Sequence, residues 1–323
     1  PIAAKTQVTQ VVLAGEKMSE NDFGWICAKV YESKDLLEDI GMDTRNLRHV
    51  VTGHYNNQPP HPGYSADSAK LAGSNRIKTL FDDKSILELL ERDGFVVIDS
   101  EATPKTSEAS HEKLTEFLFE TTDQGEDVRT DTVNFLDREQ AESCGVENQF
   151  DLLMGIPAFL NRNLKSLQDL PDAPIEPATR ENPLTIPGSI QLAEYAENDF
   201  YIAHSDNSLT DEYYTQNESD NTRLRSNFRY YTCILYANDD WAKEDGGALR
   251  IYPGSRDLLH ARSAKELELD HVDVLPQNGR LIIFDSCLAH SVERVTHSEK
   301  VRRAFTLWVL QPNNSGVRGE YYY

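Results

Sequence analysis

The apolar residues of this chain change their spacing near residue 190. Before that point they recur at helical intervals: one stripe contains Ile86, Leu89 and Leu90, and a longer one runs over residues 149–167. From Ile190 onward apolar and polar residues alternate, as they do in strands with one buried face. The pattern therefore predicts a block of helices followed by a block of strands.

The helical block is expected to contain helices over residues 86–93, 111–121 and 149–167, with a strand at Phe95–Ile98. The second block is expected to contain eight short strands, at 190–195, 200–206, 228–237, 248–252, 271–275, 280–285, 290–294 and 302–310. Eight short strands behind a group of helices are typical of a jelly roll, or double-stranded β-helix, with helices packed on one side. The expected fold class is α+β.

Residues 1–76 differ from the rest and are predicted to form an N-terminal extension and linker. Apolar residues between Phe23 and Val30 have helical spacing, and Ser33 is placed to cap a second short helix. The stretch from Gly53 to Asn75 is rich in Asn, Pro, His and Gly, which indicates a loop. The predicted main domain covers residues 77–323.

Composition narrows the possible partners and compartment. The formal net charge is −22, which argues against non-specific binding to nucleic acid or to an anionic membrane. The chain contains no run of 18 or more apolar residues, so no transmembrane helix is predicted. The four cysteines, Cys27, Cys144, Cys233 and Cys287, are dispersed without a C-x-x-C motif, which favours a reducing, intracellular compartment, cytoplasmic or nuclear. This expectation leaves open whether a leader peptide preceded Pro1.

Two histidines and one aspartate form the main candidate for chemistry. His204 and Asp206 make an H-x-D pair on a predicted strand, and alternate strand residues point the same way. His290 follows 86 residues later. Two imidazoles and one carboxylate on one face of a metal leave the opposite face open, as in non-haem Fe(II) oxygenases. The sequence therefore predicts a metal site at His204, Asp206 and His290.

Other histidines compete for these roles. His271 and Asp273 form a second H-x-D, but 19 residues before His290 leave room for little more than one strand. In a jelly roll we expect the two metal-bearing strands to face each other across the barrel with several strands between them, which favours His204. His297 lies in a polar turn and suits the third ligand less well than His290. The remaining histidines are expected to be ordinary surface or loop residues: His49, His54, His61, His111 and His260.

Strand parity selects one arginine of an adjacent pair. Arg302, Ala304, Thr306 and Trp308 share one face of the last strand, whereas Arg303 belongs to the other. An inward arginine needs an anion, and its planar fork matches a carboxylate. Arg302 is therefore predicted to bind a ligand carboxylate with help from the Thr306 hydroxyl; the alternative is a pairing with an acidic residue of the chain.

Four segments resemble one enzyme family. They are Tyr231-Thr-Cys-Ile-Leu-Tyr-Ala-Asn-Asp-Asp-Trp241, Gly246-Gly-Ala-Leu-Arg-Ile-Tyr-Pro253, Gly279-Arg-Leu-Ile-Ile-Phe-Asp285 and Arg302-Arg-Ala-Phe-Thr-Leu-Trp308. Their order and spacing resemble the catalytic core of the prolyl 4-hydroxylase superfamily of 2-oxoglutarate- and Fe(II)-dependent dioxygenases. The likeness is closest to the oxygen-sensing prolyl hydroxylases that act on hypoxia-inducible factor. It covers roughly residues 180–312, and little of it extends into residues 1–180.

The resemblance implies a cofactor and a cosubstrate. It places Fe(II) on His204, Asp206 and His290, and the distal carboxylate of 2-oxoglutarate on Arg302 and the hydroxyl of Tyr236. Four further residues would line the cosubstrate pocket: Tyr195, Tyr201, Thr306 and Trp308. The implied reaction consumes O2 and releases succinate and CO2, with ascorbate as a supporting reductant.

The resemblance also implies a substrate class. Collagen-type members usually carry lysine at the Arg302 position, and related halogenases lack the carboxylate of Asp206, so an oxygen-sensor-like hydroxylase is favoured. However, the segment Asn207–Asn227 is longer than its counterpart in the oxygen sensors, so their peptide specificity does not carry over. The leading prediction is hydroxylation of a prolyl residue in a peptide or protein. The alternatives are a small-molecule hydroxylase on the same fold and a non-catalytic binding module.

Overall fold

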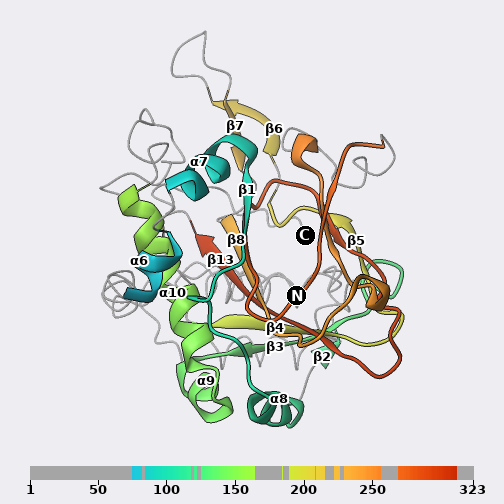
Figure 1. The fold of residues 1–323 in the computed structure, drawn as a ribbon. Helices are drawn as coiled ribbons and strands as arrows, with labels where there is room; N and C mark the ends of the chain where they lie inside the picture. Colours follow the sequence, from blue (N-terminus) through green and yellow to red (C-terminus); the bar gives the residue numbers. More distant parts are fainter. Residues whose placement is uncertain are drawn as a thin grey trace, which may run out of the picture. The chain divides into compact units, whose positions relative to one another are not determined.

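The computed structural model describes residues 75–81, 84–117, 120–121, 125–163, 184, 189–207, 209–214, 222–225, 229–255 and 268–310 (Figure 1). The two short helices expected at Phe23–Val30 and after Ser33 lie outside the described residues. The predicted boundary near residue 76 therefore stays a prediction. Within the described part, no helix is both long enough and apolar enough to cross a membrane.

Two antiparallel sheets form the body of the described chain. The larger has seven strands in the order β1 (Phe95–Ile98), β11 (Leu281–Asp285), β8 (Arg229–Tyr236), β13 (Arg302–Leu310), β4 (Ile190–Tyr195), β3 (Thr132–Leu136) and β2 (Glu120–Thr121). The smaller has four, in the order β10 (Val272–Val274), β9 (Leu249–Ile251), β12 (His290–Val292) and β5 (Tyr201–His204). A separate hairpin joins β6 (Leu209–Tyr214) to β7 (Thr222–Arg225).

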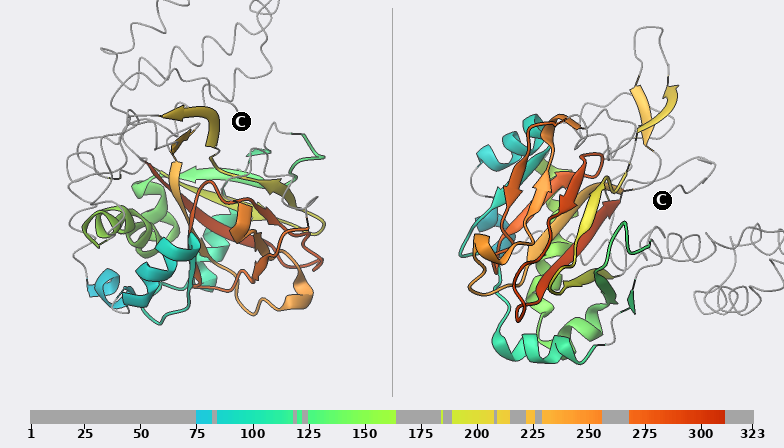
Figure 2. Two further views of the ribbon diagram at one scale, coloured as in Figure 1. Left: turned by 90° about the horizontal axis from the view of Figure 1, so that it is seen from above. Right: turned by 90° about the vertical axis from the view of Figure 1, so that its right-hand side faces the viewer.

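Five described helices lie along one side of this arrangement (Figures 1 and 2). They are α6 (Asn75–Leu80), α7 (Lys84–Asp93), α8 (Glu108–Thr115), α9 (Arg138–Cys144) and α10 (Glu147–Asn163). Buried residues of α10 pack against Cys233 and Leu235 of β8 and against Phe305 and Leu307 of β13. This core holds the helices to one face of the larger sheet.

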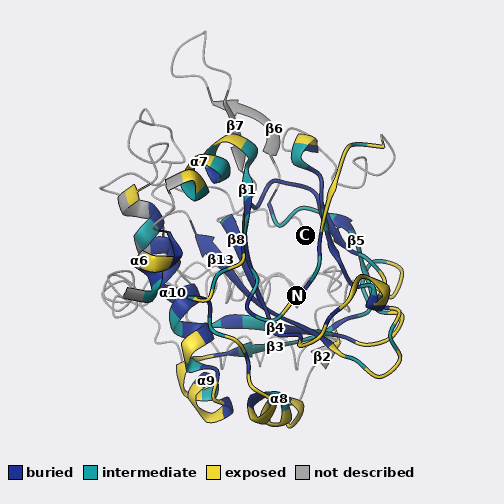
Figure 3. Cartoon of the chain, viewed as in Figure 1, coloured by how far each residue is buried: buried dark blue, intermediate teal, exposed yellow. Residues whose placement is uncertain are grey.

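The opposite face of the larger sheet packs against the smaller sheet. Ile234, Tyr236 and Ala304 share a second buried cluster with Leu249 and Ile251 of the smaller sheet. The period of two in β13 thus sends Phe305 toward the helices and Ala304 between the sheets, as the sequence predicted. Strands β8 and β13 are buried along nearly their whole length (Figure 3).

All eight strands predicted after residue 190 are present; β4 and β13 have the predicted bounds, and the other six are slightly shorter. The helical predictions at 86–93 and 149–167 correspond to α7 and α10, although residues 164–167 lie outside the described part. The helix predicted over 111–121 is wrong at its end, because α8 stops at Thr115 and β2 begins at Glu120. Part of the segment that lengthens the chain after Asn207 forms the β6–β7 hairpin.

Further elements escaped the sequence analysis, among them α6, α9 and β3. Apolar spacing gives little indication of α9, which is defined by its ends. Asp137 caps its first turn by accepting from the Gln140 amide at 2.8 Å, and the Gln140 side chain accepts from the Asp137 amide at 2.9 Å. Gly145 ends the helix with a φ of 72°, a conformation that suits glycine. A helix of this kind is set by capping and not by a hydrophobic stripe.

Candidate metal centre and anion pocket

His204, Asp206 and His290 come together as the sequence predicted. One ligating atom from each lies within 4.8 Å of the others, and no other group of three or more potential metal ligands occurs among the described residues. His204 ends β5, Asp206 lies two residues beyond it, and His290 begins β12. These residues form a metal-binding triad.

His204 was preferred because the two metal-bearing strands were expected to face each other across a barrel. That expectation is wrong. They are neighbours in the smaller sheet, where β12 pairs antiparallel with β5 and His290 stands directly opposite His204. The long separation in sequence arises because β12 inserts between β5 and β9, two strands that precede it in the chain.

Backbone carbonyls orient both imidazoles in the same way. The Nδ1 atom of His204 lies 2.9 Å from the carbonyl oxygen of Ile202, and Nδ1 of His290 lies 3.0 Å from that of Leu288. A carbonyl oxygen only accepts, so each Nδ1 carries the proton and donates it. Each Nε2 then presents its lone pair to a metal.

Aromatic rings restrict the two imidazoles further. The Tyr201 ring stacks on His204 with the centroids 3.6 Å apart and an interplanar angle of 14°. Phe284 packs against His290 with its centroid 4.7 Å away. These contacts limit ring rotation, so the triad has little freedom to rearrange before a metal binds.

The electrostatics of the triad favour the protonation states that a metal requires. Burial, and next the neighbouring His290, hold the pKa of His204 well below its ordinary value, although Asp206 opposes this shift. Burial also opposes ionisation of Asp206, but His290, Arg229, His204 and the Thr232 hydroxyl together lower its pKa to about 2. A neutral imidazole and an ionised carboxylate are the forms that bind metal.

Two side chains from β8 contact the Asp206 carboxylate. The Thr232 hydroxyl donates to Oδ2 at 2.6 Å, and an Arg229 guanidinium nitrogen lies 3.8 Å from Oδ1. The Arg229 guanidinium also stacks on Trp308, 3.9 Å from the ring centroid. The sequence analysis did not connect Thr232 with Asp206, and it missed Arg229.

Arg302 lies between the sheets as a buried cation. Only 1% of its surface is exposed, and its Nε donates to the carbonyl oxygen of Gly247 at 2.7 Å. No carboxylate among the described residues pairs with it, so the alternative of an internal ion pair finds no support there. A buried guanidinium without a counter-ion is costly, and a ligand carboxylate would remove that cost.

Tyr236 and Tyr195 flank Arg302. Their ring centroids lie 5.1 Å and 4.8 Å from the guanidinium carbon. The Tyr236 hydroxyl is fully buried and has no hydrogen-bond partner of ordinary geometry among the described residues. Burial raises the pKa of Tyr236 although Arg302 opposes the shift, so the phenol keeps its proton and can donate it to an anion.

The remaining predicted pocket residues divide between the two ends of the site. Tyr201 stacks on His204, whereas Trp308 lies beneath Arg229, next to Asp206, and not beside Arg302. The indole N–H of Trp308 is buried and lacks an acceptor among the described residues. Thr306 is buried in β13 between Ala304 and Trp308, on the face that Arg302 occupies.

A tight turn brings the backbone against Arg302. Gly246 and Gly247 have φ values of 72° and 65°, which side chains rarely tolerate. A Cβ on Gly247 would meet Cδ of Arg302 at 2.9 Å, and one on Gly246 would clash with the Arg294 carbonyl oxygen. Glycine is therefore required for the Gly247 carbonyl to accept from Arg302.

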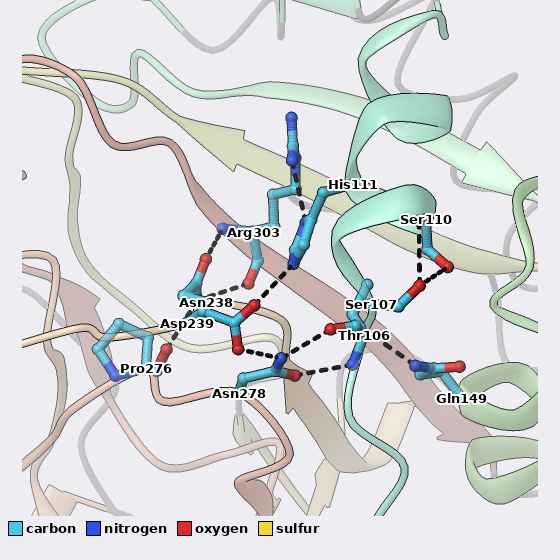
Figure 4. A network of polar contacts seen from close by, with 10 residues as sticks. All are labelled: Thr106, Ser107, Ser110, His111, Gln149, Asn238, Asp239, Pro276, Asn278 and Arg303. Atoms are coloured by element: carbon cyan, nitrogen blue, oxygen red, sulfur yellow. Dashed lines mark hydrogen bonds and ion pairs between the residues drawn. The ribbon is translucent and has the colours of Figure 1, made fainter.

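Arg303 has a different environment, on the helix side of the sheet (Figure 4). Its Nε donates to Glu194 at 2.5 Å, and a second guanidinium nitrogen donates to Nδ1 of His111 at 3.1 Å. The interpretation of His111 as an ordinary surface residue is thus wrong, because His111 links α8 to β13. Arg303 is a structural residue with a counter-ion.

The competing histidines lie away from the triad. His271 is exposed, and Asp273 forms an ion pair with Arg250 at 2.8 Å. His297 is half-buried, and its closest carboxylate is Asp245 at 3.9 Å. Neither histidine belongs to the metal-binding group.

A second ion pair supports the triad and gave no sequence signal. Arg129 donates to the buried carboxylate of Asp131 at 2.6 Å, and its guanidinium stacks on Tyr201 at 4.2 Å. Tyr201 in turn stacks on His204. Only tertiary structure brings residues 129–131 alongside β5, so no spacing in the sequence indicates this support.

The segment that carries the site matches one known protein family. Residues 190–310 match the family model of the 2OG-Fe(II) oxygenase superfamily. This segment includes the whole triad and Arg302. Together, the match and the donor set assign Fe(II) to the triad and 2-oxoglutarate as the cosubstrate.

Several solved structures resemble the chain at low identity. A prolyl-4-hydroxylase from Pseudomonas putida is 19% identical, with a TM-score of 0.46 over 71% of this chain and 98% of its own. A prolyl hydroxylase from Trichoplax adhaerens, solved with a hypoxia-inducible factor peptide, is 17% identical, with a TM-score of 0.47 over 77% and 93%. A non-heme alpha-ketoglutarate-dependent carbocyclase from nogalamycin biosynthesis is also 17% identical, with a TM-score of 0.45 over 71% and 83%. At these scores the assignment rests on the family model.

Proposed function

We propose that this chain, whose residues 190–310 match the family model of the 2OG-Fe(II) oxygenase superfamily, hydroxylates a prolyl residue of a peptide or protein. The observation that carries the oxygenase part is the metal-binding triad together with a buried arginine that has no carboxylate partner among the described residues. The two facing sheets would then be the double-stranded β-helix of this superfamily, with helices packed on one side.

The residues of the pocket have separate roles in this proposal. Arg302 would bind the distal carboxylate of 2-oxoglutarate, with the Tyr236 hydroxyl as a second donor and Tyr195 as an apolar wall. Because Arg302 is buried, water competes poorly for the guanidinium, and the charge-assisted contact keeps more of its strength. Thr306, on the same face of β13, would add a hydroxyl.

The triad residues prepare the metal end of the pocket. Bound Fe(II) with 2-oxoglutarate supplies the oxidising chemistry, in which O2 is consumed and succinate and CO2 are released. His204 and His290 keep their Nε2 lone pairs exposed by donating Nδ1–H to carbonyl oxygens, and Asp206 provides the negative charge. Tyr201 and Phe284 exclude water from the imidazole faces.

The prolyl substrate is supported by sequence resemblance and not by a contact in the site. The resemblance continues through Trp308, and an arginine stands at position 302 where collagen-type enzymes usually have lysine. Arg229 and Trp308 form a stacked wall next to Asp206, on the side of the triad away from Arg302. A substrate residue would approach the metal there.

A small-molecule substrate is the second candidate, and the β6–β7 hairpin favours it. This hairpin begins at Leu209, three residues after the Asp206 ligand in the sequence. A hairpin in that position would close a pocket instead of leaving an open peptide groove. Succinate release with proline-rich peptides, compared with free proline and a metabolite panel, separates the two candidates.

The oxygenase proposal is tested by substitution of each metal ligand. His204→Ala, Asp206→Ala and His290→Ala should each abolish Fe(II)-dependent release of succinate, because each removes one of three protein ligands. His271→Ala is the matched control from the competing H-x-D and should retain activity. Undiminished succinate release in all three ligand variants would rule the metal site out.

A further inference from the structure

Asp206 is the one triad member that lies outside a strand. It occupies a bend two residues after the end of β5, so no ladder fixes its side chain. Its neighbour Asn207 is anchored, since the Asn207 amide donates to the carbonyl oxygen of Ser286 at 2.9 Å. The backbone at Asn207 is therefore fixed to the turn after β11. The Asp206 carboxylate needs separate contacts to orient it.

Two buried hydroxyls, of Thr232 and Ser286, supply such contacts. Thr232 Oγ1 lies 2.6 Å from Asp206 Oδ2, and Ser286 Oγ lies 3.0 Å from Thr232 Oγ1. Thr232 is 1% exposed and Ser286 is 0% exposed. The second contact links Ser286 to the metal site through Thr232.

Each hydroxyl has one hydrogen, and this fixes which of the two donates to the other. An ionised carboxylate only accepts, so the single hydroxyl hydrogen of Thr232 must point at Asp206. Thr232 then has none left for Ser286, and Ser286 must donate to the lone pair of Thr232. The hydrogens run from Ser286 to Thr232 to Asp206, and a chain of this kind strengthens each of its bonds.

Sheet pairing holds both hydroxyls in place. Thr232 lies on β8 opposite Phe284 of β11, and Ser286 follows β11 with its amide donating to the Tyr230 carbonyl oxygen at 3.0 Å. Thr232 thus belongs to the larger sheet and Ser286 is hydrogen-bonded to it, whereas Asp206 follows a strand of the smaller sheet. The hydroxyl chain fixes the carboxylate of one sheet against the framework of the other.

We propose that Thr232 and Ser286 are positioning residues of the metal site, with Ser286 acting through Thr232 to set the orientation of the Asp206 carboxylate. Partners that orient a metal ligand contribute to metal affinity although they do not touch the metal. The inference rests on the metal-binding part of the proposed function and is independent of the prolyl substrate.

The test measures metal affinity without turnover. Each purified full-length variant is titrated anaerobically with Co(II), and its visible absorption gives the dissociation constant. Thr232→Val keeps the shape but removes the donor and should weaken binding by about 10- to 100-fold. Thr232→Ser keeps the hydroxyl and should bind as the wild type does. Ser286→Ala should give a smaller loss, because Thr232 can still donate but is no longer held.

The double variant separates a chain from two unrelated effects. If Ser286 acts through Thr232, Thr232→Val with Ser286→Ala should bind Co(II) no more weakly than Thr232→Val alone. Thr106→Val is the matched control, since Thr106 is equally buried and its hydroxyl bonds Gln149 outside the site. This control should leave affinity unchanged.

Several results would overturn the inference. They are wild-type affinity in Thr232→Val, an equal loss in Thr232→Ser and Thr232→Val, and losses that add in the double variant. Near-ultraviolet circular dichroism checks that each variant retains its packing, and Ser286→Ala remains informative if Thr232→Val does not fold. Failure of the wild type to bind Co(II) would instead contradict the metal-site assignment itself.

Discussion

At the scale of single residues, neighbouring arginines at the start of β13 have opposite roles. Arg302 faces the space between the sheets and has no carboxylate partner among the described residues, whereas Arg303 faces the helices and pairs with Glu194 at 2.5 Å. Period-two parity alone predicted which of them points inward. It could not predict the partners of Arg303, because Glu194 and His111 are brought there by strand pairing and helix docking.

Arg302→Ala should weaken 2-oxoglutarate binding by about 10- to 100-fold, because a charge-assisted contact contributes about 1.5–3 kcal/mol. Arg303→Ala should lower the melting temperature, since it leaves Glu194 without its partner, but should change cosubstrate affinity little. A 2-oxoglutarate titration of uncoupled decarboxylation measures both variants. If Arg303→Ala raised the apparent dissociation constant for 2-oxoglutarate and Arg302→Ala did not, the register of β13 would be wrong by one residue.

At the scale of elements, the periodic strands were predictable and the elements set by their ends were not. Strands β4, β5, β8 and β13 follow from alternation. The α9 helix depends on the Asp137 cap and Gly145, which a search for apolar stripes overlooks. Similarly, the H-x-D motif predicted the metal ligands, but the supports of Asp206 and His204 come from other elements. Thr232, Arg229 and Arg129 therefore gave no signal of their own.

The turn at Gly246–Gly247 is a short element with a measurable effect. Gly247→Ala should weaken 2-oxoglutarate binding by roughly 5- to 30-fold, because the new Cβ displaces Arg302 and costs about 1–2 kcal/mol of its hydrogen bonding. Gly254→Ala is the matched control, since a Cβ there meets nothing within 4 Å. Equal affinities of the two variants, measured by calorimetry with Mn(II) in place of Fe(II), would contradict a role of this turn in orienting Arg302.

Docking of α8 onto the sheet should depend on pH. Burial, and next the Arg303 charge, lower the pKa of His111 in the folded protein, while Asp239 opposes the shift. The unfolded chain then binds more protons, so this stabilisation is complete above the ordinary histidine pKa of 6.5 and is lost as the pH falls through the lower folded value. His111→Gln keeps an acceptor for Arg303 but does not titrate.

Thermal melts between pH 8 and pH 5 check this expectation. On acidification, the melting temperature of the wild type should fall further than that of His111→Gln. Only the wild type has an imidazole at this position that binds a proton more readily in the unfolded chain. His204 also has a lowered pKa, but it is present in both proteins and cancels in the comparison. Parallel losses in the two proteins would show that His111 does not contribute to the pH dependence.

At the scale of the whole molecule, the site exists only when the two sheets face each other. The two histidines of the triad belong to the smaller sheet and Asp206 follows it, whereas Arg302, Tyr236 and Thr232 belong to the larger sheet. A ligand that binds both sides therefore stabilises the folded chain. Saturation at 100 times the dissociation constant contributes about 2.7 kcal/mol.

Metal should accordingly raise the melting temperature of the wild type by several degrees, at roughly 2–4 °C for each kcal/mol in a domain of this size. His290→Ala and Asp206→Ala should show little or none of this shift. His271→Ala should keep it in full. A shift of the same size in the two ligand variants would mean that metal binds elsewhere in the chain.

The central claim is that metal triad and buried arginine form one pocket for 2-oxoglutarate. The most direct measurement is an anaerobic calorimetric titration of 2-oxoglutarate into protein loaded with Fe(II). We predict one binding event per chain that requires the metal, disappears in His290→Ala and is strongly weakened in Arg302→Ala. Binding of equal strength to metal-free protein or to Arg302→Ala, or no binding to the loaded wild type, would contradict the claim.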